Sequence, residues 1–488
     1  MRMFFFLLAI AAFAADTPKL NILVMDGVNN HDWAAATRYI KSILEGTGRF
    51  TVDVCTYPQK PDFKRYSAVI NNFNGGHTAA GTRWPRDVEQ DLVSYVRNGG
   101  GLIVYHAANN AFLEWPEYND MIGLGWRDKS FGAGIAIGRK GEVIPIAKGD
   151  GLPPGHGPRQ DFQVFVRDVP HPITKTLPPH WMHRAEQLTH GQHGPAAGLQ
   201  VLTYAFSEVS QQGEPMDWVR DYGKGRVYTT MLGHTWKNEP NPNLEDVYFQ
   251  ALLARGVEWA ASGAVSLPAD LGWKPLFNGR NLDGWEPRGA SLWTVNEGVL
   301  LGQRAHGKVE SPFAVPWPVE EKAYRSWLYQ QAWIYTMREF DEYDLHVEYW
   351  LPEGGNSGIS IRDRSRAHFA IGEADSARPD LAAFAKTTPA HIGYEIQLID
   401  GDADKYPSGS VYTFVAAKTG AQRKGEWNSI EIESRHSGIR TWINGELVAA
   451  HPGDAQRSKT GPIGLQLHDQ FSFMQFRNIR IREHSGAK

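Results

Sequence analysis

The 488-residue chain contains a single cysteine, Cys55, so no disulfide can form within it. It also lacks the run of about 20 apolar residues that a membrane-spanning helix needs. Its formal net charge is only −4, which gives no electrostatic reason to expect nucleic acid or an anionic membrane as a partner. These absences exclude a disulfide-stapled scaffold and a membrane-spanning protein, and we expect a water-soluble globular protein.

The short apolar run at the N-terminus has the features of an export signal. Arg2 supplies a positive charge, Phe4 to Ala12 form an apolar core, and Ala12 and Ala14 fit the small-residue rule for cleavage. We therefore predict a signal peptide over residues 1–14. An exported chain without disulfides is typical of a bacterial periplasm or exterior, so the predicted location is secreted or periplasmic.

The length predicts two domains, because one hydrophobic core rarely serves more than about 250–300 residues. From residue 18 to 262, short apolar strands such as 20–25 and 102–105 alternate with helices such as 32–44 and 247–260. This alternation predicts an α/β domain built on a parallel sheet with helices on both faces.

A different pattern follows the predicted linker at residues 263–270. Residues 271–485 contain many short strands, one of them predicted at 411–415, separated by turn residues such as Asn444-Gly445. Such a pattern predicts an antiparallel β-sandwich. The segments 304–325 and 368–389 interrupt the pattern, and we predict long loops there.

Three strands of the predicted α/β domain are followed by histidine, and ligands of open α/β sheets bind beyond the carboxyl ends of strands. The residues are His31, His106 and His234. Histidine suits proton transfer or metal binding, but the spacing proves neither, and each residue could instead belong to a polar loop. Glu186 follows His183 at a spacing compatible with a helix, so this pair either binds a ligand or proton or lies on the surface.

The first domain resembles the trehalose-utilisation (ThuA-like) family, which has the fold of class I glutamine amidotransferases, a flavodoxin-like architecture. The resemblance implies sugar metabolism. Where that fold would place a nucleophilic cysteine this chain has His106, so thiolate chemistry is not expected. The resemblance rests on these motifs: Asn30-His31-Asp32-Trp33, Gly99-Gly100-Gly101 through His106-Ala107, His171-Pro172-Ile173, Ala185-Glu186-Gln187-Leu188, and Gly223-Lys224-Gly225 leading to Gly233-His234-Thr235.

In the predicted sandwich, three strands each place two polar groups on one face, because side chains alternate along a strand. The pairs could be a solvated outer face, but arginine, glutamate, glutamine and histidine are more typical of a binding surface. Asn356 and Asp400 lie at strand ends beside them. The pairs are Ser360 with Arg362, Glu395 with Gln397, and Gln466 with His468.

The second domain resembles the 3-keto-disaccharide hydrolase domain family, a concanavalin A-like jelly roll of sugar-active proteins. This chain departs from the family's usual pattern at Asp469, which follows His468 where glycine is usual. The resemblance rests on Leu276-Phe277-Asn278-Gly279 through Gly284-Trp285, Gly355-Asn356-Ser357-Gly358, Tyr394-Glu395-Ile396-Gln397, Gly425-Glu426-Trp427-Asn428, Gly461-Pro462-Ile463-Gly464 through His468, and Phe476-Arg477-Asn478-Ile479.

This resemblance implies cleavage of 3-keto-glycosides by hydrolysis or by elimination and hydration. Such chemistry needs a base, an acid and an oxyanion stabiliser. Glu395 and His468 are candidates for base or acid, and Arg362 and Gln397 for the oxyanion. Asn356, Ser360, Asp400 and Gln466, together with His31, His106, Glu186 and His234, are candidates for substrate binding. A divalent metal held by Glu395, Asp400 or His468 could replace the oxyanion donors.

Two further functions remain open at the level of sequence. The sandwich could bind glycan without catalysis, attached to a sugar-modifying ThuA-like domain, and the 17 tryptophans fit either sugar stacking or core packing. A conventional glycosidase would need two carboxylates, for which Glu395 with Asp400 or Glu348 are the candidates. In each case the expected partner is a carbohydrate, and the oligomeric state is unknown.

Overall fold

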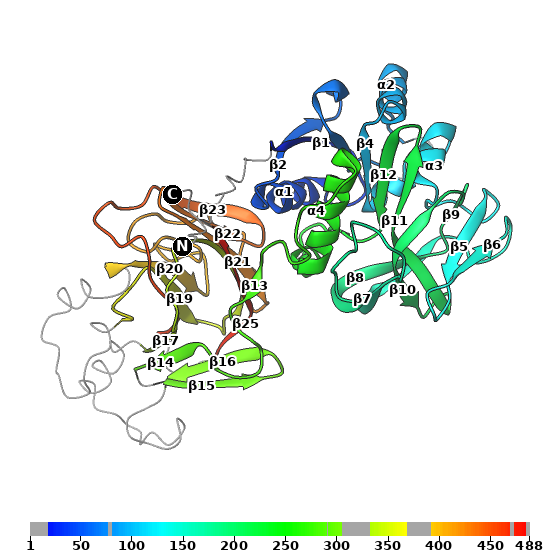
Figure 1. Ribbon diagram of the computed structural model, residues 1–488. Helices are drawn as coiled ribbons and strands as arrows, with labels where there is room; N and C mark the ends of the chain where they lie inside the picture. Colours follow the sequence, from blue (N-terminus) through cyan, green and yellow to red (C-terminus); the bar gives the residue numbers. More distant parts are fainter. Residues whose placement is uncertain are drawn as a thin grey trace, which may run out of the picture. The chain divides into compact units, whose positions relative to one another are not determined.

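The computed structural model describes residues 18–76, 81–289, 291–304, 332–367, 392–468 and 473–484. The chain divides into two compact units between Leu271 and Gly272 (Figure 1). The predicted signal peptide, residues 305–325 of the first predicted loop and all of the second lie outside the described residues. No helix within the described ranges is long and apolar enough to cross a membrane.

The first unit is mixed α/β. At its centre five parallel strands lie in the order β2-β1-β3-β4-β12. Because the strands are parallel, their carboxyl ends lie at one edge of the sheet, and the loops that leave them meet there. The strands are β1 (Leu20–Asp26), β2 (Phe50–Thr56), β3 (Ala68–Asn71), β4 (Gly101–Tyr105) and β12 (Gly225–Thr230).

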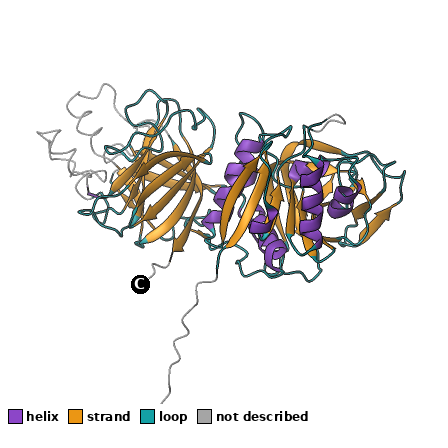
Figure 2. Ribbon diagram, turned by 90° about the horizontal axis from the view of Figure 1, so that it is seen from above, coloured by secondary structure: helices purple, strands orange, loops and turns teal. Residues whose placement is uncertain are grey.

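Helices cover both faces of these strands, as the alternating pattern predicts (Figure 2). Alternate side chains of the buried strands point to opposite faces, and Leu23, Met25 and Val104 pack with the helices α2 and α3. Asp32 begins the first helix as its N-cap, with its carboxylate accepting from the Ala35 amide. The helices are α1 (Trp33–Gly46), α2 (Arg86–Arg97), α3 (Pro116–Ile122) and α4 (Val247–Ser262), with a short 3-10 helix, η2 (His106–Asn110), directly after β4.

The parallel sheet predicted from the sequence is only part of this unit. Beyond β12 the sheet continues as antiparallel strands in the order β11-β10-β7-β8. Strand β5 pairs with β11, and β6 and β9 pair with β5. No helix of the structure separates these strands, which run as hairpins. They are β5 (Ala133–Ile137), β6 (Val143–Ile146), β7 (Gly155–Val166), β8 (His180–His190), β9 (His193–Gly194), β10 (Gln200–Ser207) and β11 (Gln212–Tyr222).

The segment after α4, predicted as a linker, is bonded to that helix. The Ser266 hydroxyl and amide donate to Glu258, and Arg255 donates to the Leu267 carbonyl. Residues up to Leu271 therefore form part of the first unit.

The second unit is all-β and contains two antiparallel sheets. One has the order β14-β17-β24-β19-β20, and the other β15-β16-β25-β18-β21-β22-β23, with β13 beside β25. The strands of the first sheet are β14 (Trp285–Arg288), β17 (Ala332–Thr336), β19 (Asn356–Ile361), β20 (Tyr394–Ile399) and β24 (Ile463–Leu467). Those of the second are β13 (Lys274–Pro275), β15 (Ser291–Asn296), β16 (Val299–Arg304), β18 (Glu342–Trp350), β21 (Asn428–Arg435), β22 (Gly438–Ile443), β23 (Glu446–His451) and β25 (Met474–His484).

One apolar core lies between these sheets. Ile359, Ile396 and Leu465 of the five-stranded sheet share it with Val347 and Ile432 of the larger sheet. Because side chains alternate, the residues between these apolar positions point to the opposite face of the five-stranded sheet. The polar residues predicted as a site, Ser360, Glu395, Gln397 and Gln466, alternate with the core in this way.

One strand prediction in this unit is wrong. Val411 makes only isolated bridges, to Ile396 and Val415, so residues 411–415 form no strand.

Candidate functional site

Three histidines meet at the carboxyl edge of the parallel sheet. His31 lies in the loop after β1, His106 follows β4 directly, and His234 lies in the loop after β12. Their ring centroids are 5.0 Å apart for His31 and His106, 4.2 Å for His31 and His234, and 5.0 Å for His106 and His234. One nitrogen from each ring can be chosen so that all lie within 4.8 Å of one another. We call these residues the histidine cluster.

Hydrogen bonds between loops hold the cluster in place. The Asp32 amide donates to the Thr235 carbonyl at 3.0 Å, which ties the loop after β1 to the loop after β12. The buried Asn29 side chain donates to the Asn72 carbonyl after β3. His106 has a φ of 44°, a left-handed conformation that is uncommon outside glycine and that is often found at functional sites.

The surroundings favour the neutral form of two of these histidines, His106 and His234. Burial is the main cause that lowers the pKa of His106. For His234, burial and then the positive potential of His106 and His31 lower the pKa far below its usual range. The His234 ring also stacks on Trp236, with centroids 3.9 Å apart and planes 13° from parallel. Neutral imidazole is the form that accepts a proton or binds a metal.

A buried group of charges lies behind the cluster. Glu186 Oε2 accepts from the amides of Gly233 and His234 at 2.8 and 3.2 Å. His183 lies between two carboxylates, 3.6 Å from Glu186 and 3.8 Å from Asp246. Burial alone would lower the pKa of His183, but the two carboxylates outweigh it and raise the pKa to about 9.

His183 and Glu186 lie on strand β8 and are fully buried, so they form neither a helical pair nor a surface pair. In a regular strand, residues three apart point to opposite faces. Ala185 between them has a φ of 45°, and the pairing with β7 shifts by one residue here. This β-bulge turns both side chains toward the same side.

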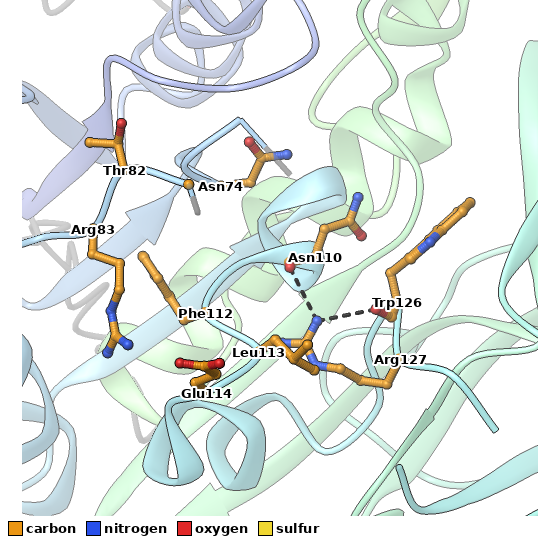
Figure 3. A pocket seen from close by; sticks show the side chains of 10 residues that line it. Asn74, Thr82, Arg83, Asn110, Phe112, Leu113, Glu114, Trp126 and Arg127 are labelled. Carbon is orange, nitrogen blue, oxygen red and sulfur yellow. Dashed lines mark hydrogen bonds between the residues drawn. The ribbon is translucent and has the colours of Figure 1, made fainter. Parts of the chain in front are cut away.

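A cleft of about 160 Å³ lies along the same edge of the sheet (Figure 3). Its walls include Asn74, which is hydrogen-bonded to Asn30 beside His31, and Asn110, which belongs to the same 3-10 helix as His106. Arg127 donates to the carbonyls of Asn110 and Trp126 at 3.1 and 3.2 Å (Figure 3). The cleft therefore lies next to the loops that carry the histidine cluster, and amide, guanidinium and aromatic groups line it.

The second candidate site lies on the face of the five-stranded sheet that points away from the core. Strand register places Glu395 opposite Ser360, Gln397 opposite Gly358, and Gln466 opposite Trp333. We call this set, with Asn356 and Tyr335, the Glu395 face. Gln397 donates to the Asn356 side chain at 3.3 Å, so these two predicted residues are in contact.

Glu395 is buried here, with 4% of its surface exposed. Burial raises the pKa of Glu395 to about 8, and the nearby side-chain amide of Gln466 offsets only a part of this increase. Gly358 makes room for this side chain, because a Cβ there would lie 2.6 Å from Glu395 Oε1. Gly464 does the same for the ring of Tyr335, which a Cβ would approach to 2.4 Å.

Several buried polar atoms of the Glu395 face lie close to Glu395 or Tyr335 but make no hydrogen bond of normal geometry among the described residues. They are the Gln466 amide nitrogen and oxygen and the Ser360 hydroxyl. Burying such groups without hydrogen bonds costs about 1–3 kcal/mol each, so this face offers unused donors and acceptors for a polar ligand.

The structure corrects the expected position of Arg362. Alternation predicts Arg362 beside Ser360, but its φ is 61°, and the left-handed turn of the backbone ends the alternation. Its guanidinium instead donates to the Ser434 hydroxyl at 2.8 Å and to the Arg435 carbonyl, both on the other sheet. Arg362 therefore does not join the Glu395 face.

Two other predicted carboxylates have structural partners. Asp400 accepts from the Gly354 amide at 2.8 Å and lies 3.4 Å from Lys424, so it stabilises a turn. Glu348 lies on the larger sheet and binds Arg477 at 2.6 Å, so it cannot be the second carboxylate of a glycosidase beside Glu395. His468 follows the end of β24, where strand pairing no longer fixes its direction.

Sequence reasoning missed the aromatic part of the Glu395 face. Trp333 and Tyr335 lie on β17, and their rings stack with centroids 5.6 Å apart. Asp363 was missed as well, and it accepts from the Tyr335 hydroxyl at 3.3 Å. The strand 332–336 is apolar throughout except for its last residue, so the alternation that reveals the neighbouring strands is absent.

Comparisons with known proteins match each unit separately. The family model for trehalose utilisation (ThuA) matches residues 21–260, and the model for a 3-keto-alpha-glucoside-1,2-lyase-like domain matches residues 272–482. The comparison with curated proteins gave no match.

Solved structures resemble one unit each. A protein of Parabacteroides merdae described as ThuA-like is 34% identical, over 51% of this chain and 93% of its own, with a TM-score of 0.47. A protein of Parabacteroides distasonis described as a glycosyl hydrolase is 20% identical, over 44% of this chain and 95% of its own, with a TM-score of 0.31. The carbohydrate-binding module CBM66 of Bacillus subtilis is 12% identical, over 41% of this chain and 96% of its own, with a TM-score of 0.25.

The two domain models together span almost all of the described chain, and they match the fusion that the motifs predict. The chain is therefore a carbohydrate-related fusion protein, whose residues 21–260 belong to the trehalose utilisation family and whose residues 272–482 match the 3-keto-alpha-glucoside-1,2-lyase-like domain.

Proposed function

We propose that this protein cleaves 3-keto-glycosides by elimination followed by hydration, with Glu395 as the proton-transferring base. The observation that carries this proposal is a buried carboxyl group with a pKa raised to about 8, on a face with amide and hydroxyl groups that make no hydrogen bond of normal geometry. Perturbed carboxyl groups of this kind are concentrated at catalytic sites. The matched family's description names a lyase of 3-keto-α-glucosides, which fits the same chemistry.

The reaction needs few groups. The C3 ketone acidifies the C2–H bond; the base takes that proton, the electron pair forms the C1–C2 double bond, and the C1–O bond breaks. The leaving oxygen receives a proton, and water then adds at C1 while C2 regains a proton. The net result is hydrolysis without an external oxidant or reductant.

The Glu395 face offers a group for each role. Ionised Glu395 would remove the C2 proton, and the amides of Gln397 and Gln466 would donate to the enolate oxygen at C3. His468 is the group that we propose for protonating the leaving oxygen. Asn356 and Ser360 lie on the same face and would bind sugar hydroxyls, while the buried rings of Trp333 and Tyr335 pack beside them and hold the face in shape.

A divalent metal at this face would need donors that are engaged elsewhere. Asp400 would have to leave Gly354 and Lys424 to join Glu395 and His468. We therefore assign the enolate to amide donors rather than to a metal in this unit.

We further propose that the first unit is a class I glutamine amidotransferase-like domain, that the second is a concanavalin A-like jelly roll, and that the chain is exported. The mature N-terminus tests the last point. Sequencing the processed protein should find cleavage after Ala14, and an intact Met1 on protein from the cell interior would contradict export.

Turnover of 3-keto-disaccharides by the full chain tests the proposed function. The protein should release free sugar from a 3-keto-α-glucoside and leave the unoxidised disaccharide intact. Binding of the keto substrate without turnover would contradict catalysis and would support a glycan-binding sandwich instead. Equal cleavage of the unoxidised disaccharide would indicate a conventional glycosidase.

A further inference from the structure

The proposed reaction uses the second unit and gives no role to the histidine cluster of the first. The cluster combines residues from three separate segments, two loops and the 3-10 helix η2, and each ring is held by a hydrogen bond or by stacking. A merely structural role would leave the rings dispersed or paired with carboxylates. Instead their rings contact one another, with centroids no more than 5.0 Å apart.

We propose that His31, His106 and His234 bind one divalent first-row transition-metal ion, of which Zn²⁺ is the reference. Three imidazoles with a further open coordination position are the arrangement of catalytic zinc sites. In such a site the ligand nitrogens lie about 3.3 Å apart, given metal–nitrogen distances of about 2.0–2.1 Å. Nitrogens already within 4.8 Å of one another need to approach by about 1.5 Å at most.

The hydrogen bonds of two rings select the nitrogen that faces the metal. His106 Nδ1 lies 2.6 Å from the Met231 carbonyl, and His31 Nδ1 lies 3.1 Å from the Asn29 side-chain oxygen. Each of these oxygens accepts, so Nδ1 carries the proton and the lone pair is on Nε2. A backbone or amide oxygen that fixes the tautomer in this way is the usual outer shell of a metal-binding histidine.

The charge around the cluster favours a cation. The Glu186 carboxylate accepts from the amides of Gly233 and His234, directly behind the cluster. Asp246 lies on the other side of His183, so two carboxylates flank this ring within 3.8 Å behind the cluster. A divalent ion would be held by the imidazole nitrogens and attracted by these carboxylates.

The donor set also indicates the class of metal and the ligand that would complete it. Imidazole ligands suit zinc, copper, iron and nickel and disfavour magnesium and calcium, which prefer oxygen. The neighbouring cleft, lined by Asn74, Asn110 and Trp126, could admit a small hydroxylated or carbonyl-bearing molecule to an open position.

Metal binding by the full-length protein tests this proposal. After dialysis against a chelator, Zn²⁺ titration by calorimetry should give one site per chain, and Co²⁺ should produce visible absorption bands of a low-coordinate nitrogen-ligated ion. The variants His31→Gln and His234→Gln should each weaken Zn²⁺ binding at least 100-fold and abolish the Co²⁺ bands. The exposed His180, in the same unit, is the matched control: His180→Gln should bind like the wild type.

The metal-free melting temperature of each variant checks that folding is intact. If one variant does not fold, the Co²⁺ spectrum of the wild type still shows whether a nitrogen-ligated metal site is present. The proposal is overturned if the chelated wild type binds neither ion at micromolar concentration, or if folded His31→Gln and His234→Gln variants bind as tightly as the wild type.

Discussion

The histidine cluster and the Glu395 face show how one physical effect produces opposite chemistry. Burial favours the uncharged form of any titratable group. At the cluster it lowers the pKa of His106 and His234, which favours the uncharged imidazole, the form that binds a metal. At the Glu395 face burial raises the pKa of Glu395 to about 8. This carboxyl group is therefore mostly protonated at neutral pH and becomes an ionised base as the pH rises above 8.

The two sites also differ in how the chain builds them. The cluster uses loops that leave parallel strands at one edge of a sheet, so its residues come from positions far apart in sequence. The Glu395 face uses side-chain alternation along paired antiparallel strands. The first arrangement brings side chains around one point, whereas the second spreads donors along neighbouring strands of one sheet face.

The largest expected effect is the loss of activity when the carboxylate is removed. Glu395→Gln should lower kcat on a 3-keto-α-glucoside by about 10²–10⁴-fold, because a positioned general base contributes that much. Glu353→Gln is the matched control, since that side chain is 92% exposed on a loop of the same unit, and it should leave kcat unchanged. Steady-state assays measure both, and an active Glu395→Gln variant would remove Glu395 from the mechanism.

Next in size is the cost of disrupting the charges behind the cluster. Glu186→Gln should destabilise the protein by about 3–5 kcal/mol at pH 7, because it leaves the buried, protonated His183 with only one carboxylate. The exposed pair of Arg159 and Glu239 provides the control, and Glu239→Gln should cost less than about 1 kcal/mol. Chemical denaturation measures the free energy of unfolding of both variants. Equal losses would show that the buried charges stabilise the protein no more than an exposed ion pair does.

This buried group also predicts a pH dependence of stability. The folded-state pKa of His183 is raised to about 9, so its stabilisation is fully present below pH 6.5 and is lost as the pH rises to 9. The wild type should therefore lose more stability than Glu186→Gln between these values. Parallel slopes in denaturation experiments across that window would contradict the assignment.

A smaller effect is expected when the space for Glu395 is filled. Gly358→Ala places a Cβ 2.6 Å from Glu395 Oε1, so the carboxyl group must move, and kcat/KM should fall about 10–100-fold. Gly157→Ala, where no atom lies within 4 Å, should have no effect. Activity that survives Gly358→Ala at an unchanged melting temperature would mean that the position of Glu395 is not critical.

The smallest expected effect is the dependence of kcat/KM on pH, which tests the raised pKa of Glu395. A base with a pKa of about 8 must be ionised, so kcat/KM should rise about tenfold per pH unit below 8 and level off above it. A profile that instead falls above pH 8 would make Glu395 the acid of the reaction.

Much of this arrangement could be predicted from the sequence because it follows regular periodicity. Helices α1 and α4 follow apolar spacing and aspartate caps at Asp32 and Asp246. Alternation around Glu395 and Gln466 identified the polar face of two strands. In each case the spacing of apolar residues along the chain determines which face of the helix or strand is buried.

The features that escaped prediction depend on single backbone conformations or on tertiary pairing. Arg362 and Ala185 adopt left-handed φ values that no local pattern reveals, and each redirects the side chains beside it. Tyr335 lies on an almost entirely apolar strand without a polar partner to mark its face. The antiparallel strands β5–β11 were missed because no helix separates them, so the alternation that indicates α/β structure stops there.

The most direct test of the central claim follows the hydrogen at C2 of the substrate. In D₂O, early product formed from a 3-keto-α-glucoside should carry solvent deuterium at C2, beyond the exchange seen when free product is incubated with Glu395→Gln. Product that retains its original C2 hydrogen at full turnover would contradict proton abstraction by Glu395 and the elimination mechanism with it.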